Sequence, residues 1–140
     1  DTDFSNLANA LTHADAALDH AEKGAALVAP EQREVYDDQI LYPARIYLEC
    51  LRFHKLAADL AEALRSNADK SADAEMRKAA RRDIKRLKSE LTSQLERLIA
   101  LLEQGSGMKK FEGWYKISHF RKITPPPSPE ELKVILRTIN

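Results

Sequence analysis

Histidine and cysteine are the side chains through which this sequence would most readily bind a metal ion or attack a substrate. The four histidines stand at positions 13, 20, 54 and 119. None of them has a carboxylate three residues earlier, as the Glu-x-x-His pairs of di-iron bundles require. The sequence also contains no His-Glu-x-x-His zinc motif, no phosphate-binding loop and no Gly-x-Ser-x-Gly elbow. We therefore predict no metal ion, no cofactor and no catalytic residue.

Cys50 and the paired carboxylates support the same prediction. Cys50 is the single cysteine, so no internal disulfide can form. It falls on the apolar side of a predicted helix without a catalytic signature, which is typical of a buried apolar side chain. Asp37-Asp38 and Glu130-Glu131 are neighbours in sequence, and adjacent helical residues diverge by about 100°. Neither pair can therefore act as an acid/base couple.

Aromatic residues gather between positions 110 and 120, and they give the first candidate binding site. Phe111, Trp114 and Tyr115 stand there beside several lysines. Aromatic faces with polar groups nearby suit a sugar ring or a peptide, so these three residues are the candidate ligand-binding residues. The alternative, which we favour, is that they plug the open end of a helical core.

Basic residues between positions 77 and 88 give the second candidate site. Spacings of three and four residues place several of them on one helix face, and the set is Arg77, Arg81, Arg82, Lys85, Arg86 and Lys88. A basic patch of this kind suits nucleic acid or another anionic surface. We favour a solvated face that complements the acidic first half of the chain, because no aromatic residues for base stacking lie nearby. The chain as a whole is neutral, with 22 basic and 22 acidic residues.

The composition predicts an all-α fold that would position these side chains. The sequence has 20 Ala and 18 Leu against 8 Ile and 3 Val. Alanine and leucine favour helices, whereas β-branched residues favour strands. A chain of 140 residues is long enough to bury a core of its own as one domain. No apolar run approaches the roughly 20 residues that a membrane-spanning helix needs.

Apolar residues recur every three or four positions, which predicts an antiparallel bundle of three long helices, an aromatic connecting segment and a short C-terminal helix. The helices are expected at about 3–28, 30–65, 72–104 and 129–139, within one domain that covers 1–140. Pro43 lies inside the second helix and should kink it about one turn earlier. Residues 125–127 form a polyproline spacer, and Ser128-Pro129-Glu130-Glu131 has the form of a capping box.

Two stretches resemble a known type of module. Residues 36–49 (YDDQILYPARIYLE) and residues 111–115 (FEGWY) are similar to segments of accessory helical modules in large bacterial glycoside-hydrolase-like proteins, including the α-glucuronidase type. The resemblance implies a helical domain of a secreted carbohydrate-active protein, periplasmic or extracellular, with catalysis in a separate barrel domain. It carries over no catalytic residue, because only Trp114 and His119 could match the His-rich, Trp-containing stretch of that type, and their spacing differs.

We accordingly expect a non-catalytic helical accessory domain whose partners are other domains of the same polypeptide, with carbohydrate as a candidate ligand. The alternative is a stand-alone helical protein-interaction domain that uses the basic face of the third predicted helix. A small nucleic-acid-associated bundle is a third hypothesis, and the neutral total charge argues against it.

Overall fold

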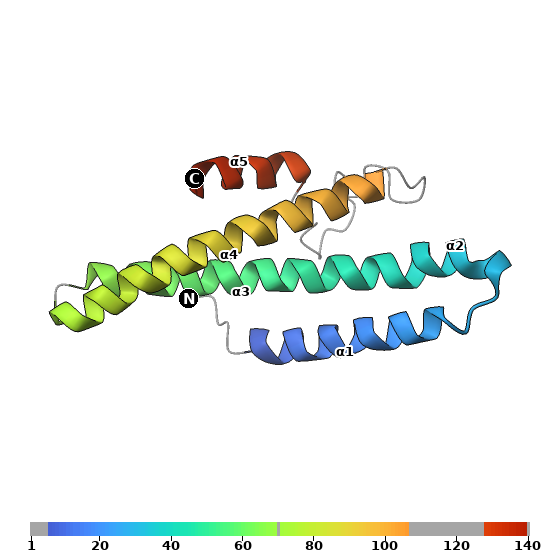
Figure 1. Ribbon diagram of the computed structural model, residues 1–140, viewed down its shortest axis with the longest axis horizontal. Helices are drawn as coiled ribbons and strands as arrows, with labels where there is room; N and C mark the ends of the chain where they lie inside the picture. The colour runs from blue at the N-terminus through green and yellow to red at the C-terminus, as the bar shows by residue number, and fades with distance from the viewer. Residues whose placement is uncertain (1–5, 70, 107–127, 140) are drawn as a thin grey trace, which may run out of the picture.

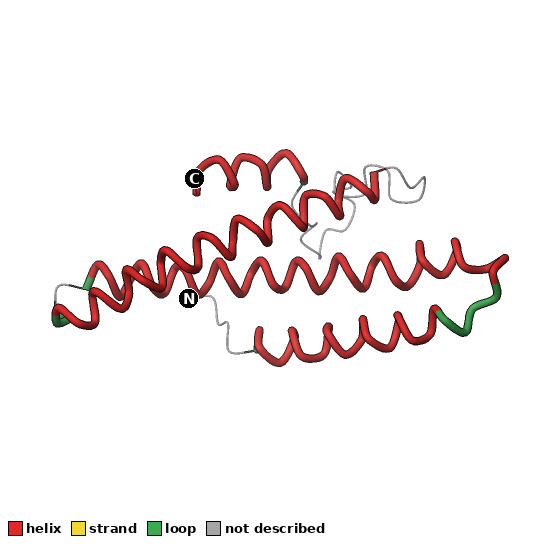
Figure 2. Tube along the Cα trace, viewed as in Figure 1, coloured by secondary structure: helices red, strands yellow, loops and turns green. Residues whose placement is uncertain are grey.

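Every regular element of the structure is a helix. The computed structural model describes residues 6–69, 71–106 and 128–139, and within these ranges it holds helices joined by short turns and no strand (Figure 2). The prediction of an all-α fold is therefore confirmed. The aromatic segment and the polyproline spacer at 125–127 lie outside the described residues.

The first helix, α1, covers Leu7–Ala25 and packs through alanine. Its buried residues are Ala14, Ala21 and Ala25, and it packs against the long helix α3, Tyr42–Ala68. Small side chains at a helix contact allow the two backbones to approach closely. The contact between α1 and α3 is therefore made by small side chains at the buried positions of α1.

The second helical segment is continuous but changes its winding. It consists of a 3-10 turn at Pro30–Gln32, the short helix α2 at Arg33–Tyr36, a π-helical turn, η2, at Asp37–Leu41, and α3. At the end of the π turn the N–H of Tyr42 donates to the carbonyl of Asp37, five residues earlier. Pro43 has no N–H to donate, and the wider turn before it accommodates the missing hydrogen bond. Where the sequence predicted a kink, the structure places this π turn.

The longest helix, α4, covers Ala74–Ser106 and supplies most of the core. Leu95, Leu98 and Leu102 are fully buried where α4 packs against α3. The turn between α3 and α4 ends at Asp73, whose carboxylate accepts a hydrogen bond from the N–H of Met76 at 2.8 Å. This is an N-cap, which satisfies one of the free N–H groups at the start of the helix.

The last helix, α5, covers Pro129–Ile139 and packs on α4. It begins with the predicted capping box: the N–H of Glu131 donates to Ser128 Oγ at 3.2 Å, and the N–H of Ser128 donates to the Glu131 carboxylate at 2.8 Å. Leu132 is fully buried. The ion pair between Lys133 and Glu103 also joins α5 to α4.

The helices α1, α3, α4 and α5 run in alternating directions, and each packs on the next (Figure 1). α3 lies between α1 and α4. The end of the α3–α4 hairpin extends beyond both α1 and α5 (Figure 1). We call this end, residues 59–69 and 71–88, the hairpin tip. In the described part of the chain the tip is built from these two helices and their turn.

Candidate functional site

The predicted basic residues lie on the hairpin tip and are exposed. Helix α4 turns its apolar side toward α3 through residues such as Ala80 and Leu87. The cations on the outer sides of the helix are Arg77, Lys78, Arg81, Arg82, Lys85 and Lys88, and we call these six residues the basic face. Arg86 was also predicted to belong to the basic patch. In the structure it lines a groove between α3 and α4, which is described below.

The described carboxylates of the first half of the chain do not pair with the basic face. Within residues 6–69, 71–106 and 128–139, no acidic side chain lies within ion-pair distance of these six cations. Arg86 is the cation of the predicted set that is paired. It contacts Glu90 at 2.9 Å and Asp83 at 3.5 Å, both on α4 itself, and the hydrogen bond and charge of Glu90 raise its pKa. The six cations are thus exposed and make no ion pair with described residues, although the charge of Arg77 adds, at longer range, to the hydrogen bonds from Ser71 that lower the pKa of Asp69.

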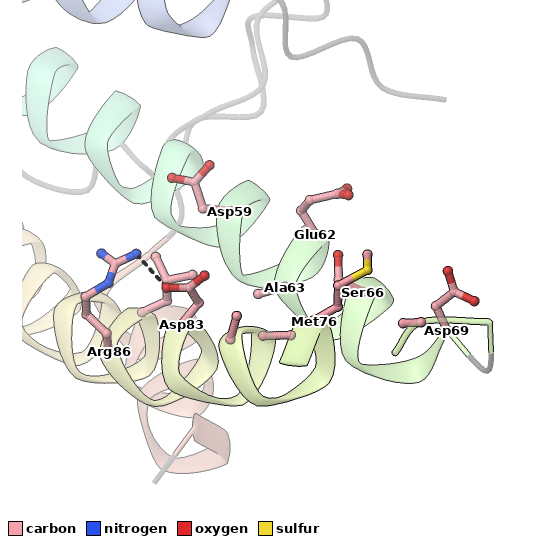
Figure 3. Close-up of a pocket in the computed structure, with 12 residues that line it drawn as sticks. Asp59, Glu62, Ala63, Ser66, Asp69, Met76, Asp83 and Arg86 are labelled. Carbon is pink, nitrogen blue, oxygen red and sulfur yellow. Dashed lines mark ion pairs between the residues drawn. The ribbon is translucent and has the colours of Figure 1, made fainter. Parts of the chain in front are cut away.

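A groove of about 470 Å³ runs between α3 and α4 at the hairpin tip (Figure 3). Its floor contains the small side chains of Ala63, Ala79 and Ala80. Alanine is too short to fill the space between two helices, which explains why the groove is open. Met76 lies at the groove and is 60% exposed.

The rim of this groove is acidic. Asp59 and Glu62 come from α3, Asp83 comes from α4, and Asp69 comes from the turn (Figure 3). Each has a partner on its own segment, as Asp59 has in Lys55 and Glu62 has in Arg65. Asp69 accepts hydrogen bonds from the N–H and the hydroxyl of Ser71, which lower its pKa.

A polar network crosses the three long helices beyond the tip. Gln94 on α4 is 1% exposed, and its amide nitrogen donates to the backbone carbonyl of Glu49 at 3.0 Å and to the Glu49 carboxylate. Arg97 donates to the Gln94 amide oxygen at 2.7 Å. Arg52 donates to Glu49 at 2.8 Å and contacts Asp15 of α1 at 3.3 Å. Every polar atom of the Gln94 side chain thus has a partner, as a buried amide requires.

Two tyrosines on either side of the π turn bind neighbouring helices in the same way. The Tyr36 hydroxyl donates to the carbonyl of Ala21 on α1 at 2.9 Å, and the Tyr42 hydroxyl donates to the carbonyl of Leu101 on α4 at 2.9 Å. The hydroxyl end of each tyrosine lies against a glycine, Gly24 on α1 and Gly105 on α4. Burial raises the pKa of Tyr42 to about 12. We interpret both tyrosines as structural contacts.

The described histidines and Cys50 lie apart from one another, and His119 lies outside the described residues. Among the described residues, no three His, Cys, Asp or Glu side chains come close enough to hold a metal ion. His13 and His20 are exposed on α1, and His54 is exposed on α3, where its ring lies 5.3 Å from that of Phe53. Cys50 is half-buried, and its burial, with a smaller contribution from Glu49, raises its pKa to about 11. A thiol with a raised pKa is a poor nucleophile at neutral pH.

The predicted aromatic site falls where the structure gives no description. Phe111, Trp114 and Tyr115 lie outside the described residues, so the choice between a ligand platform and a core plug stays a prediction. None of the described helices combines the length and apolar character of a membrane span.

Residues 36–49, which carried the resemblance, form the end of α2, the π turn and the start of α3. Tyr36, Tyr42 and Glu49 of this stretch all make contacts between helices, so its residues have a structural use. No protein-family model matches the sequence, and no curated protein and no solved structure shows significant similarity to it.

Proposed function

We propose that this chain is a helical docking module, which binds an acidic surface of another protein or domain through the basic face of α4. The observation that supports the proposal is the set of exposed cations on the hairpin tip that make no ion pair with a described carboxylate. Unpaired surface charges of one sign attract a partner of opposite sign and increase its association rate. We also propose that the three long helices form an antiparallel bundle, which holds this face rigidly in place.

The proposal can be tested with a labelled peptide. The probe is a fluorescein-labelled helical peptide of about 15 residues, which spans about 22 Å, with leucine on one face and glutamate on the other. We expect saturable binding by fluorescence anisotropy that weakens as salt is raised. The double variant Arg81→Glu/Lys85→Glu should weaken binding by about tenfold or more, which corresponds to about 1.4 kcal/mol.

A matched control reverses two exposed charges elsewhere, Lys23→Glu on α1 and Arg137→Glu on α5. This control changes the net charge equally and should leave the affinity unchanged. Equal weakening in both double variants would show that total charge, and no specific face, attracts the peptide. A DNA duplex that bound more tightly than the peptide and lost binding in the Arg81→Glu/Lys85→Glu variant would replace the proposal with nucleic-acid binding.

We propose separately that this chain is an accessory domain of a carbohydrate-active protein. This proposal rests on the resemblance of residues 36–49 and 111–115. Titration with acidic oligosaccharides, followed by the fluorescence of Trp114, would test it. If the fluorescence emission of Trp114 is blue-shifted, poorly quenched and unchanged by sugar, the core plug is favoured. If the emission is red-shifted, readily quenched and altered by sugar, the ligand platform is favoured.

A further inference from the structure

The groove at the hairpin tip continues the surface on which α1 packs. α1 meets the side of α3 that carries Arg45 and Arg52, which contact Glu22 and Asp15 of α1. The next residues at the same seven-residue spacing on α3 are Asp59 and Ser66. Residues seven apart lie on one side of a helix, and both of these line the groove.

α1 covers only part of this side of α3. Leu11, near the start of α1, lies with Arg52 and Leu56 beside a second groove, so the start of α1 reaches this part of α3. Toward its C-terminal end, α3 extends with α4 beyond both α1 and α5 (Figure 1). The tip therefore presents the same helix-packing surface, and none of the described helices lies on it.

The shape and charge of the groove indicate which side chains a helix bound in it would carry. Its alanine floor leaves about 470 Å³, which large apolar side chains can occupy. Its rim has four carboxylates, at positions 59, 62, 69 and 83. Three of them are paired with Lys55, Arg65 and Arg86 of their own segments. These pairs are exposed to solvent and therefore weak, so the cations of an incoming helix can replace them. An occupant therefore needs leucine-like residues on its inner face and lysine or arginine on both flanks. Met76 is flexible enough to adapt its shape to such side chains.

We infer that the tip groove is a docking site for a basic amphipathic helix of a partner protein, which lies along α3 in line with α1. This site is distinct from the basic face of α4, since it selects the opposite charge. The hairpin tip thus has an acidic groove and a basic face, and the two surfaces can bind different partners.

The probe for this site is a fluorescein-labelled helical peptide of about 15 residues with leucine on one face and lysine on the other. We expect saturable binding by anisotropy. Ala63→Leu, which fills the floor, and Asp83→Lys, which reverses a rim charge, should each weaken binding by about tenfold or more. Hydrogen exchange should become slower in the tip when the peptide is bound.

Two matched controls make the same changes outside the groove. Ala61→Leu adds the same atoms at an exposed position of α3, and Glu96→Lys reverses an exposed charge of α4. Both should bind the peptide as the parent protein does. The inference is overturned if no saturable binding is found, if the controls weaken it equally, or if Ala63→Leu leaves it unchanged while its thermal unfolding is normal. Because Arg81→Glu/Lys85→Glu should not weaken binding of this leucine/lysine peptide, failure here is distinguishable from failure of the basic face.

Discussion

The hydroxyl of Tyr42 occupies the space in which a β-carbon at position 105 would lie. A β-carbon built on Gly105 would be 1.8 Å from the hydroxyl oxygen and 2.5 Å from the adjacent ring carbon. Tyr42 is only 3% exposed and donates a hydrogen bond to Leu101, so its ring cannot move aside without losing that contact. Glycine is required here by close packing, within a regular helix.

Overpacking a core usually costs about 1–3 kcal/mol, and the severe clash at position 105 predicts the upper end of this range, so Gly105→Ala should destabilise the protein by a net of about 2 kcal/mol. The net value includes the gain of about 1 kcal/mol that alanine gives over glycine in a helix. The measurement is urea unfolding. Gly24→Ala is the comparison: its β-carbon would be 2.5 Å from the Tyr36 hydroxyl, which donates to Ala21. It should destabilise the protein less than Gly105→Ala does, because the Tyr36 ring is only half-buried. In a Tyr42→Leu background the penalty at position 105 should largely disappear, and a penalty that persisted would contradict this account.

The raised pKa of Tyr42 makes a second prediction, about pH. Burial raises this pKa from 10.0 to about 12, so the unfolded chain releases the tyrosine proton before the folded protein does. The stability that this group contributes is complete below pH 10 and is lost as the pH rises from 10 to 12. The slope is at most about 1.4 kcal/mol per pH unit.

The measurement compares the free energy of unfolding of the parent protein with that of Tyr42→Phe across this pH range. Tyr42→Phe should be less stable at neutral pH by about 1 kcal/mol, the value of one hydrogen bond. The difference between the two proteins should shrink as the pH rises above 10 and change sign before pH 12, because the loss of up to about 1.4 kcal/mol per pH unit exceeds the hydrogen bond's contribution. Tyr47→Phe, at a position that is 58% exposed, should show a constant difference. A constant difference for Tyr42→Phe as well would refute the assignment.

At the scale of helices, two contacts fix the register of the α3–α4 pair. Tyr42 meets Leu101, and Glu49, seven residues later on α3, meets Gln94, seven residues earlier on α4. Seven residues are two helical turns, so the two contacts lie on one line along the interface. Polar residues at positions of this kind select one register, because any shift would leave them buried without partners.

Gln94→Leu should cost about 1–3 kcal/mol, because it removes the hydrogen bond to a Glu49 side chain that is 16% exposed. The double variant Glu49→Leu/Gln94→Leu should recover most of this loss, since apolar pairs often replace buried polar pairs without cost. A double-mutant cycle by urea unfolding measures the coupling. If the double variant were as destabilised as the sum of the single variants, the network would have no coupling.

The sequence predicted local features well and long-range pairs poorly. The capping box from Ser128 to Glu131 depends on residues three apart, and the structure confirms it. The long helix expected at about 72–104 is present as α4, because the recurrence of its apolar residues is visible in the sequence. The Glu49–Gln94 pair joins residues 45 positions apart, and no local pattern shows which polar residues will meet. The groove was missed because Ala63 and Ala79 look like ordinary apolar positions, although their small volume creates the space.

At the scale of the whole molecule, the basic face should contribute little to stability. Its six cations make no ion pairs with described residues, so their removal breaks no contact. Arg81→Ala/Lys85→Ala should unfold within about 0.5 kcal/mol of the parent protein, as is usual for exposed positions. Thermal and urea unfolding measure this. A loss of several kcal/mol would show that these side chains support the fold, and their role in docking would then need to be reassessed.

The alternating direction of the helices has a consequence for folding kinetics. Because α1 packs on α3, α3 on α4 and α4 on α5, the helices meet neighbours in the chain sequence and the contact order is low. Helical proteins of low contact order fold in microseconds to milliseconds. The α3–α4 hairpin, with its short turn and two register contacts, is the expected nucleus. In stopped-flow experiments, Gln94→Leu should therefore slow refolding, whereas removal of the α5 cap by Ser128→Ala should mainly accelerate unfolding.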